Sequence, residues 1–216
     1  MLRAAFAVGL ATGAYGVSFG AIAVASGLSV VQACALSLLL FSGGSQFAMV
    51  AVLAGGGSPA AAIGTGVMLG SRNAFYGLRL AGLLRLRGVR RLLGAQLVID
   101  ESTAVATAQD TEEAGRLGFW ATGITIFVLW NLATLLGALG AGLVSDPRVL
   151  GLDAAAPAAF LALLAPRMRA REPWAVALGA AVVAGLAVPY LPAGVPVLLA
   201  AVVAIGVGLA DRPGEP

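Results

Sequence analysis

The sequence contains no histidine and no lysine, and it has a single cysteine, Cys34. Without histidine it cannot form the Ser–His or Cys–His pairs of nucleophilic catalysis, nor the HExxH zinc motif. Without lysine it lacks the GxxxxGK[ST] loop that binds nucleotide phosphates. One cysteine forms no intramolecular disulfide, and no GxGD pattern points to an aspartyl protease. We therefore predict a protein that is not an enzyme and that needs no cofactor and no metal.

Charge is also scarce: 11% of the 216 residues are charged, 60% are hydrophobic, and the mean hydropathy is +0.97. Soluble domains carry about 25% charged residues, so this chain cannot cover itself with a polar surface. We predict an all-α integral membrane protein, multi-pass in the inner (plasma) membrane and in contact with the lipid bilayer. The expected organisation is a single transmembrane transporter domain over residues 1–210 and a polar tail over residues 211–216.

The basic residues are distributed as in a membrane protein. The net charge of +3 and the pI of about 9.8 reflect 13 basic residues, all of them arginine. Most lie between apolar runs, with clusters at 85–91 and 167–171. Such clusters mark cytoplasmic loops, so no nucleic-acid partner is expected.

The first apolar run, from about Ala4 to Ser26, contains two pairs of glycines four residues apart, Gly9/Gly13 and Gly16/Gly20. Small residues at this spacing let a second helix approach closely. They also interrupt the apolar core that a signal peptide requires, so we interpret the run as a helix that is not cleaved.

The second run, from about Val30 to Leu53, has Phe41-Ser42-Gly43-Gly44-Ser45-Gln46-Phe47 at its centre. Each glycine inside a helix costs about 1 kcal/mol, so a break is expected here. A helix that restarts at such a break exposes N–H groups that can bind an anionic group of a substrate. We predict substrate binding at this motif, by Gly43, Gly44, Ser45 and Gln46. A simple kink packed against a neighbouring helix is the alternative.

Arg72 and Asn73 lie near the middle of the third run, from about Ala60 to Leu84. A helix of about 25 residues is long enough to cross a bilayer. An arginine at its centre costs about 2.5 to 3.5 kcal/mol on insertion scales, so its side chain requires a partner, a water-filled cavity or a ligand. Tyr76 and Arg79 follow Arg72 at positions i+4 and i+7 and share its helix face.

The fourth run, Leu92 to Ala108, carries Asp100 and Glu101 at its centre. As one helix it would present a polar stripe, formed by Gln96, Asp100, Thr103 and Thr107. Three roles are open for the two acids: an ion pair with Arg72, binding of an ammonium group, or transfer of a coupling proton. A purely structural ion pair with Arg72 is the alternative without transport function.

The remaining runs cover about 117–144, 150–166, 174–191 and 195–210, and Pro157 interrupts the second of them. Three runs separate the two arginine clusters, whereas two loops on one side of a membrane require an even number of crossings. One run must therefore fail to span, and the candidates are 92–108 and the segment with Pro157. We expect about seven to eight membrane segments, with one or more broken or re-entrant helices.

Several of these motifs occur together in one known family. Four sets of residues resemble, in order and spacing, motifs of the AzlC-type branched-chain amino acid exporters. They are Ser18-Phe19-Gly20 with Gly27-Leu28-Ser29, the 41–47 motif, Arg72-Asn73-Ala74-Phe75-Tyr76, and Asp100-Glu101 with Ala104. These are the large subunits of two-component permeases. The resemblance covers most of the chain. It implies a small membrane partner subunit of the AzlD type and export of leucine, isoleucine, valine and, as a further candidate, methionine.

The chain departs from the family pattern at two positions. Gly70 stands where relatives often have asparagine, and Asn73 stands where they often have histidine. If that histidine couples protons in relatives, Asp100 or Glu101 would have to do so here.

We therefore expect a secondary transporter that exports aliphatic amino acids and is coupled to protons. Arg72 or the Gly43–Gln46 backbone would bind the substrate carboxylate, and Asp100 or Glu101 its ammonium group. The other expected substrate-binding residues are Asn73, Tyr76, Phe19 and Phe47, with Phe75 as a further apolar wall. A non-transporting membrane scaffold or assembly subunit is the alternative, whereas a passive channel is disfavoured because the central polar groups resemble a closed site.

Overall fold

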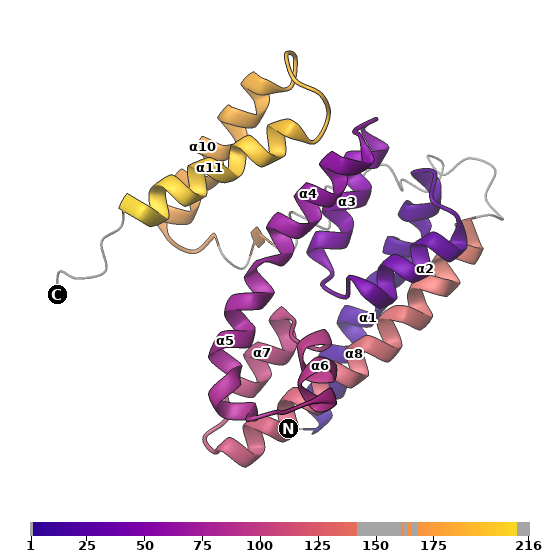
Figure 1. Cartoon of the computed structure of the whole chain (residues 1–216), viewed down its shortest axis with the longest axis vertical. Coiled ribbons are helices and arrows are strands. Elements are labelled where there is room, and N and C mark those ends of the chain that lie inside the picture. The colour runs from indigo at the N-terminus through magenta and orange to yellow at the C-terminus, as the bar shows by residue number, and fades with distance from the viewer. Residues whose placement is uncertain (1, 142–160, 162–163, 166–167, 211–216) are drawn as a thin grey trace.

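The computed structural model describes residues 2–141, 161, 164–165 and 168–210, and within these residues all regular structure is helical (Figure 1). The helices are α1 (Leu2–Ala25), α2 (Val30–Leu39), α3 (Gly44–Ala54), α4 (Pro59–Gly70), α5 (Arg72–Leu84), α6 (Val89–Gln96), α7 (Asp100–Thr107), α8 (Glu112–Ala141), α10 (Arg171–Ala187) and α11 (Val195–Ala210). Most of the Pro157 segment and the whole tail 211–216 lie outside the described residues.

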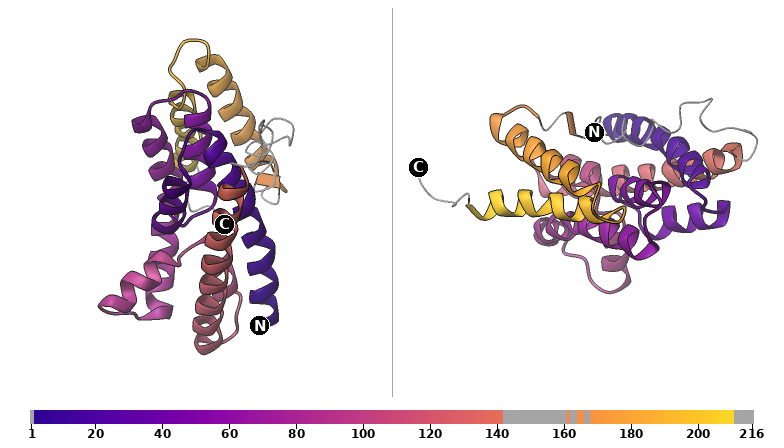
Figure 2. Two further views of the ribbon diagram at one scale, coloured as in Figure 1. Left: turned by 90° about the vertical axis from the view of Figure 1, so that its right-hand side faces the viewer. Right: turned by 90° about the horizontal axis from the view of Figure 1, so that it is seen from above.

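The two longest helices, α1 and α8, pack side by side and run in the same direction (Figure 2). Along α1, Gly9 lies against Thr125 and Gly13 against Leu129, and the contacts continue in this order as far as Gly20. A methyl group on Gly20 would overlap the carbonyl oxygen of Thr134. The predicted close approach of a second helix at these glycines is confirmed. Both helices are long and apolar enough, by length and composition, to cross a membrane.

The predicted helix over residues 60–84 is present, but it is divided at Ser71 into α4 and α5. The Ser71 hydroxyl donates a 2.7 Å hydrogen bond to the Met68 carbonyl within the break. At its far end, the Arg116 Nε donates to the Leu83 carbonyl at 2.7 Å, so α5 ends beside the first turns of α8. Together α4 and α5 span about 38 Å, in the direction opposite to α1 and α8.

Helices α2 and α3 form an open hairpin that starts at the end of the molecule where α1 ends, and its arms pack on different helices, α2 on α8 and α3 on α4. The Ser37 hydroxyl donates to Thr134 Oγ1 at 3.2 Å, and α2 continues from there toward the middle of α8. Helix α3 then returns antiparallel to α4, with Met49 against Gly66. The arms contain 10 and 11 residues. Each is thus about 15 Å long, half the thickness of a bilayer core.

Helices α6 and α7 form a second hairpin, which enters from the opposite end. Near the end of α6, Gly94 lies close to Trp120, and Leu97, directly after the helix, packs against Gly123. Helix α7 runs back in the opposite direction, and near its end the Ala106 carbonyl lies close to Gly115, in the first turns of α8. Each arm has 8 residues and is therefore about 12 Å long.

The prediction of one helix over 92–108 with a continuous polar stripe is therefore wrong. Gln96 ends α6 and Asp100 begins α7, and the three residues between them, Leu97, Val98 and Ile99, are not helical. The local cause is that the Ser102 hydroxyl forms hydrogen bonds with the backbone groups of Ile99 and Leu97 within this break. The predicted break inside the second run, by contrast, is confirmed between Leu39 and Gly44.

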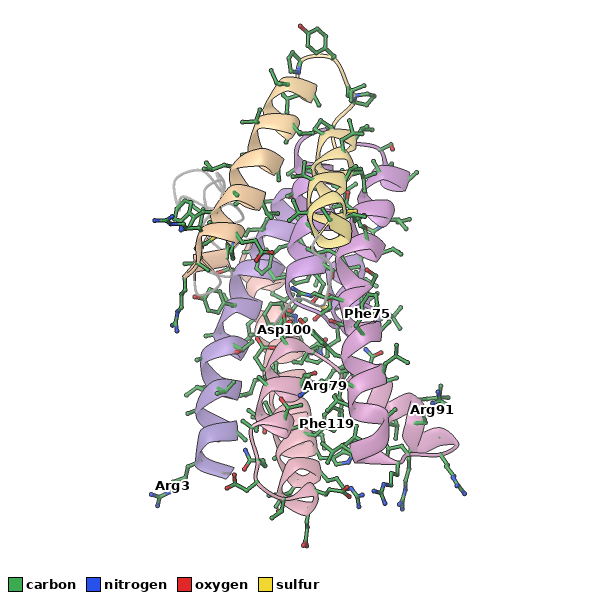
Figure 3. The ribbon with its side chains drawn as sticks, turned by 90° about the vertical axis from the view of Figure 1, so that its left-hand side faces the viewer. Arg3, Phe75, Arg79, Arg91, Asp100 and Phe119 are labelled. Carbon is green, nitrogen blue, oxygen red and sulfur yellow. The ribbon has the colours of Figure 1, made fainter. Side chains whose placement is uncertain are left out.

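The arginines of the first cluster lie at the end of the molecule where α8 begins. Arg85 forms a 3.1 Å ion pair with Glu112, in the first turn of α8. Figure 3 shows Arg3 and Arg91 at this same end and Asp100 close to mid-height. The acid of α7 thus lies far from both ends of the helix bundle.

Helices α10 and α11 pack against each other, and Figure 1 shows this pair on one side of the other helices. Gly194, in the turn between them, lies against Ala61 of α4. The two closing apolar runs are therefore helices, as predicted. The count of seven to eight membrane segments and the single-domain organisation stay predictions.

Candidate functional site

The tip of the first hairpin is held by Gln46. Its Oε1 accepts hydrogen bonds from the N–H groups of Gly43 at 3.0 Å and Ser42 at 3.4 Å, two residues that precede α3. Gly43 has φ of 60°, a conformation that glycine adopts without the strain of a side chain. The Gln46 side chain is fully buried. Sequence reasoning assigned it to substrate, whereas the structure uses its carbonyl to fix the hairpin tip.

The tip of the second hairpin is built in a similar way by Ser102. Its hydroxyl accepts from the Ile99 N–H at 3.1 Å and donates to the Leu97 carbonyl at 2.6 Å. In both hairpins, the third residue of the returning helix thus binds the backbone ahead of it, as in a helix capping motif. The two tips meet halfway along α8.

Arg72, at the start of α5, joins these two tips. Its Nη2 lies 2.9 Å from Asp100 Oδ2 on α7 and 3.5 Å from the Ser42 carbonyl oxygen at the first hairpin tip. Tyr76, one turn along α5, donates to Asp100 Oδ1 at 2.7 Å. Both oxygens of Asp100 therefore have partners on α5, and about a quarter of each charged side chain is exposed, 25% for Arg72 and 23% for Asp100. The predicted ion pair between the two is present.

A cavity of about 230 Å³ lies where the two tips meet α1 and α8. This volume holds several water molecules or one small organic molecule, since a liquid water occupies about 30 Å³. One wall carries the carboxyl residues Asp100 and Glu101, and the opposite walls are mostly apolar and aromatic. The cavity is lined by Thr12, Tyr15, Phe41, Ser42, Gly43, Gly44, Phe47, Ile99, Asp100, Glu101, Ile126 and Trp130.

A second, more open cavity of about 350 Å³ lies on the side of α4 and α6. Asn73 lines this cavity, together with Ser71 and Gln96. Phe41 and Ser42 line both cavities, so the first hairpin tip separates them. The Gln96 amide donates to the Leu38 carbonyl at 2.7 Å, which ties the end of α6 to the end of α2.

The structure brings only some of the predicted site residues to the first cavity. Gly43, Gly44, Phe47, Asp100 and Glu101 line it. Arg72 and Tyr76 bind Asp100 directly. Asn73 belongs to the second cavity, and Ser45 and Gln46 are fully buried at the start of α3. Phe19 is also fully buried, behind Phe47, with ring centroids 5.6 Å apart. Phe75 is 70% exposed and is not among the residues that line the cavity.

Sequence reasoning did not assign seven of the residues that line the cavity: Phe41, Ser42 and Ile99 at the hairpin tips, and four residues of the two long helices. Thr12 and Tyr15 come from α1, and Ile126 and Trp130 come from α8. A polar Thr12–Tyr15 pair within a glycine-rich helix was the available signal. It gave no indication of which side of α1 would meet the hairpin tips, because that depends on packing between helices far apart in sequence.

Comparison with known proteins decides the family. The AzlC protein family matches residues 7–144, which include every helix that lines the cavity. The chain belongs to the AzlC family. Two relatives agree with this. An uncharacterized membrane protein of Archaeoglobus fulgidus is 33% identical over 167 residues, 76% of this chain and 73% of the relative. The inner membrane protein YgaZ of Escherichia coli is 31% identical over 178 residues, 79% of this chain and 72% of YgaZ.

The resemblance inferred from the motifs is thus confirmed. Membership of the AzlC family, with relatives named as membrane proteins, identifies the chain as a membrane protein of a family linked to transport. No solved structure matches the chain significantly.

Proposed function

We propose that this AzlC-family protein is a secondary transporter that exports branched-chain amino acids through the cavity between the hairpin tips. The observation that carries the proposal is the composition of this cavity. Carboxyl groups of Asp100 and Glu101 stand on one wall, and Phe47, Ile126 and Trp130 supply apolar surface. An aliphatic amino acid needs both, because its ammonium group requires an acid and its side chain requires apolar surroundings.

The arrangement of the helices also supports transport. We propose that α1, α8 and the divided helix α4–α5 cross the inner membrane, while the two hairpins re-enter from opposite sides. Many transporters bind their substrates near the bilayer midplane between helices that are broken there. If α6–α7 re-enters, the run 92–108 no longer counts as one of the three membrane crossings between the two arginine clusters. The runs 117–144 and 150–166 are then left, and two crossings there would satisfy the positive-inside rule.

Both acids of α7 line the cavity, and we propose a different task for each. Asp100 is bound by Arg72 and Tyr76 of α5, so its charge is balanced by the protein. Glu101 follows it on α7 and lines the cavity with Tyr15. We propose that Asp100 holds the site together and that Glu101 binds the substrate ammonium or carries the coupling proton. A small membrane subunit of the AzlD type is the proposed partner.

The test is leucine efflux from cells that lack their own exporters and are fed leucine-containing dipeptides. The protein is expressed together with its small membrane subunit, and Glu101→Gln and Arg72→Ala are compared at equal membrane levels. Glu112→Gln is the matched control, because Glu112 is an exposed acid that pairs with arginines at the end of the bundle.

We expect leucine efflux above background, abolished by Glu101→Gln and Arg72→Ala and retained by Glu112→Gln. Any residual flux of Glu101→Gln should no longer respond to the proton gradient. If the correctly inserted pair of subunits shows no leucine efflux while both subunits still assemble, leucine is not the substrate, and a different substrate or the scaffold function takes its place.

A further inference from the structure

Two buried hydrogen-bond donors at the cavity have no acceptor among the described residues. Trp130 is 3% exposed and Ser42 is 9% exposed. The Trp130 Nε1 and the Ser42 Oγ make no hydrogen bond within this part of the chain. A buried tryptophan N–H normally finds a partner, and a buried donor without one costs free energy. Both residues line the first cavity, which is where a ligand could supply an acceptor.

The start of α3 lies beside these two side chains. The N–H groups of Gly44 and Ser45 have no backbone acceptor in the described part of the chain, since both belong to the first turn of the helix. A Cβ placed on Gly43 would lie 3.9 Å from the Trp130 ring, so the indole packs on the residue that precedes this turn. Helix α3 therefore directs its positive end toward the same region as the indole and the hydroxyl.

The acids of the cavity lie on a different hairpin tip from this region. Asp100 and Glu101 are on the tip of the second hairpin, whereas Ser42, Gly43 and Gly44 are on the tip of the first. Arg72 is not among the residues that line the cavity, and its Nη2 is bound to Asp100. The donors available to a substrate carboxylate in this cavity are therefore the first hairpin tip and Trp130, together with the hydroxyls of Thr12 and Tyr15 on α1.

We propose that Trp130 and Ser42, with the first N–H groups of α3, form a carboxylate subsite of the cavity. This inference rests on the proposed function and adds the orientation of the substrate. The α-carboxylate binds the Trp130 indole N–H, the Ser42 hydroxyl and the Gly44 N–H, and the ammonium group faces the acids of α7. The site then requires a zwitterion, because an amine or a carboxylic acid alone satisfies only one of the two hairpin tips.

The experiment measures equilibrium binding to the full chain assembled with its small membrane subunit in lipid nanodiscs, with three probes of similar apolar shape. L-Leucine carries both charged groups, 3-methylbutylamine lacks the carboxylate, and 4-methylpentanoate lacks the ammonium group. Trp130→Phe removes the indole N–H and keeps an aromatic ring, and Ser42→Ala removes the hydroxyl alone. Trp120→Phe is the matched control, since Trp120 is on the same helix and packs on Phe119 away from the cavity. Glu101→Gln tests the opposite wall.

We expect Trp130→Phe and Ser42→Ala each to weaken leucine binding by roughly tenfold or more, because each removes a hydrogen bond to a charged group. Binding of 3-methylbutylamine should stay unchanged in both variants. Glu101→Gln should show the reverse pattern, with the amine affected and 4-methylpentanoate unaffected. Trp120→Phe should bind all three probes like the wild type.

Two results would overturn the subsite alone. One is leucine binding that stays at the wild-type level in both Trp130→Phe and Ser42→Ala. The other is an equal loss of leucine and amine binding, which would make these residues part of the packing and not of a carboxylate site. Wild-type protein that binds none of the three probes would overturn the proposed function, and the subsite with it.

Discussion

Arg72 and Asp100 begin two different helices, α5 and α7, and their side chains meet at 2.9 Å. Each residue stands at a break in what the sequence presents as a continuous apolar run. The pair, with the Ser42 carbonyl, connects the divided helix α4–α5 to both hairpin tips. It therefore fixes the place where the cavity forms.

Removing one member of this pair should destabilise the protein strongly. We expect Arg72→Met to lower the free energy of unfolding by about 3 kcal/mol, because it leaves the Asp100 carboxylate without its main partner in a partly buried site. The double variant Arg72→Met/Asp100→Leu should recover most of this loss and still fail to transport. Thermal unfolding in detergent, followed by tryptophan fluorescence, measures the stability.

The exposed ion pair of Arg85 and Glu112 serves as the control. Its side chains are 67% and 57% exposed. Such pairs contribute below about 1 kcal/mol. Arg85→Met should therefore change stability little, and an effect as large as that of Arg72→Met would contradict the special role of the central pair.

Labelling from the two sides of the membrane should show that the hairpins re-enter. In a Cys34→Ser background, single cysteines at Arg87 and Asp110, which flank α6–α7, should react with an impermeant maleimide from the cytoplasmic side. Cysteines at Ala25 and Gly55, which flank α2–α3, should react from the opposite side. The reason is that arms of about 12 to 16 Å are too short to cross a core of about 30 Å. Labelling of the two flanks of one hairpin from opposite sides would show that it spans.

Helix α8 offers a matched pair of glycines for testing its contact with α1. A Cβ on Gly137 would overlap the Val17 carbonyl oxygen, whereas a Cβ on Gly140 would meet nothing within 4 Å. We expect Gly137→Ala to destabilise by at least about 1 to 3 kcal/mol, because the backbone of α1 must move. Gly140→Ala should be neutral or stabilising by up to about 1 kcal/mol, through helix propensity. Equal melting temperatures of the two variants would contradict the close contact between α1 and α8.

The Tyr76 hydroxyl should matter for holding Asp100 in place. Tyr76→Phe removes the hydroxyl that donates a 2.7 Å hydrogen bond to this carboxylate and keeps the aromatic ring. We expect a loss of about 1 to 2 kcal/mol in stability and a lower rate of leucine efflux. Tyr190→Phe is the control, because this tyrosine is 84% exposed in the turn before α11. Normal stability and efflux in Tyr76→Phe would show that the Tyr76 hydroxyl is not needed to position the acid.

The sequence by itself determined the class of protein and several local features. A hydrophobic fraction of 60% leaves too few polar residues for a soluble surface, whatever the fold. Paired glycines weaken a helix locally, so the break before Gly44 could be predicted. The spacing of Gly9, Gly13, Gly16 and Gly20 likewise predicted close helix packing, because it follows from the period of one helix.

Only the tertiary structure decided which residues share the cavity. The run 92–108 was named as a candidate for re-entry, but the break before Asp100 was not located, because its residues Leu97, Val98 and Ile99 are apolar and include no glycine or proline. Gln46 was predicted to bind substrate; the structure shows that its carbonyl caps the first hairpin tip, and its role in substrate binding stays a prediction. Trp130 reached the site through the parallel packing of α8 on α1. Contacts of this kind join segments far apart in the chain, and their geometry depends on all the helices packing together, which no local pattern of residues records.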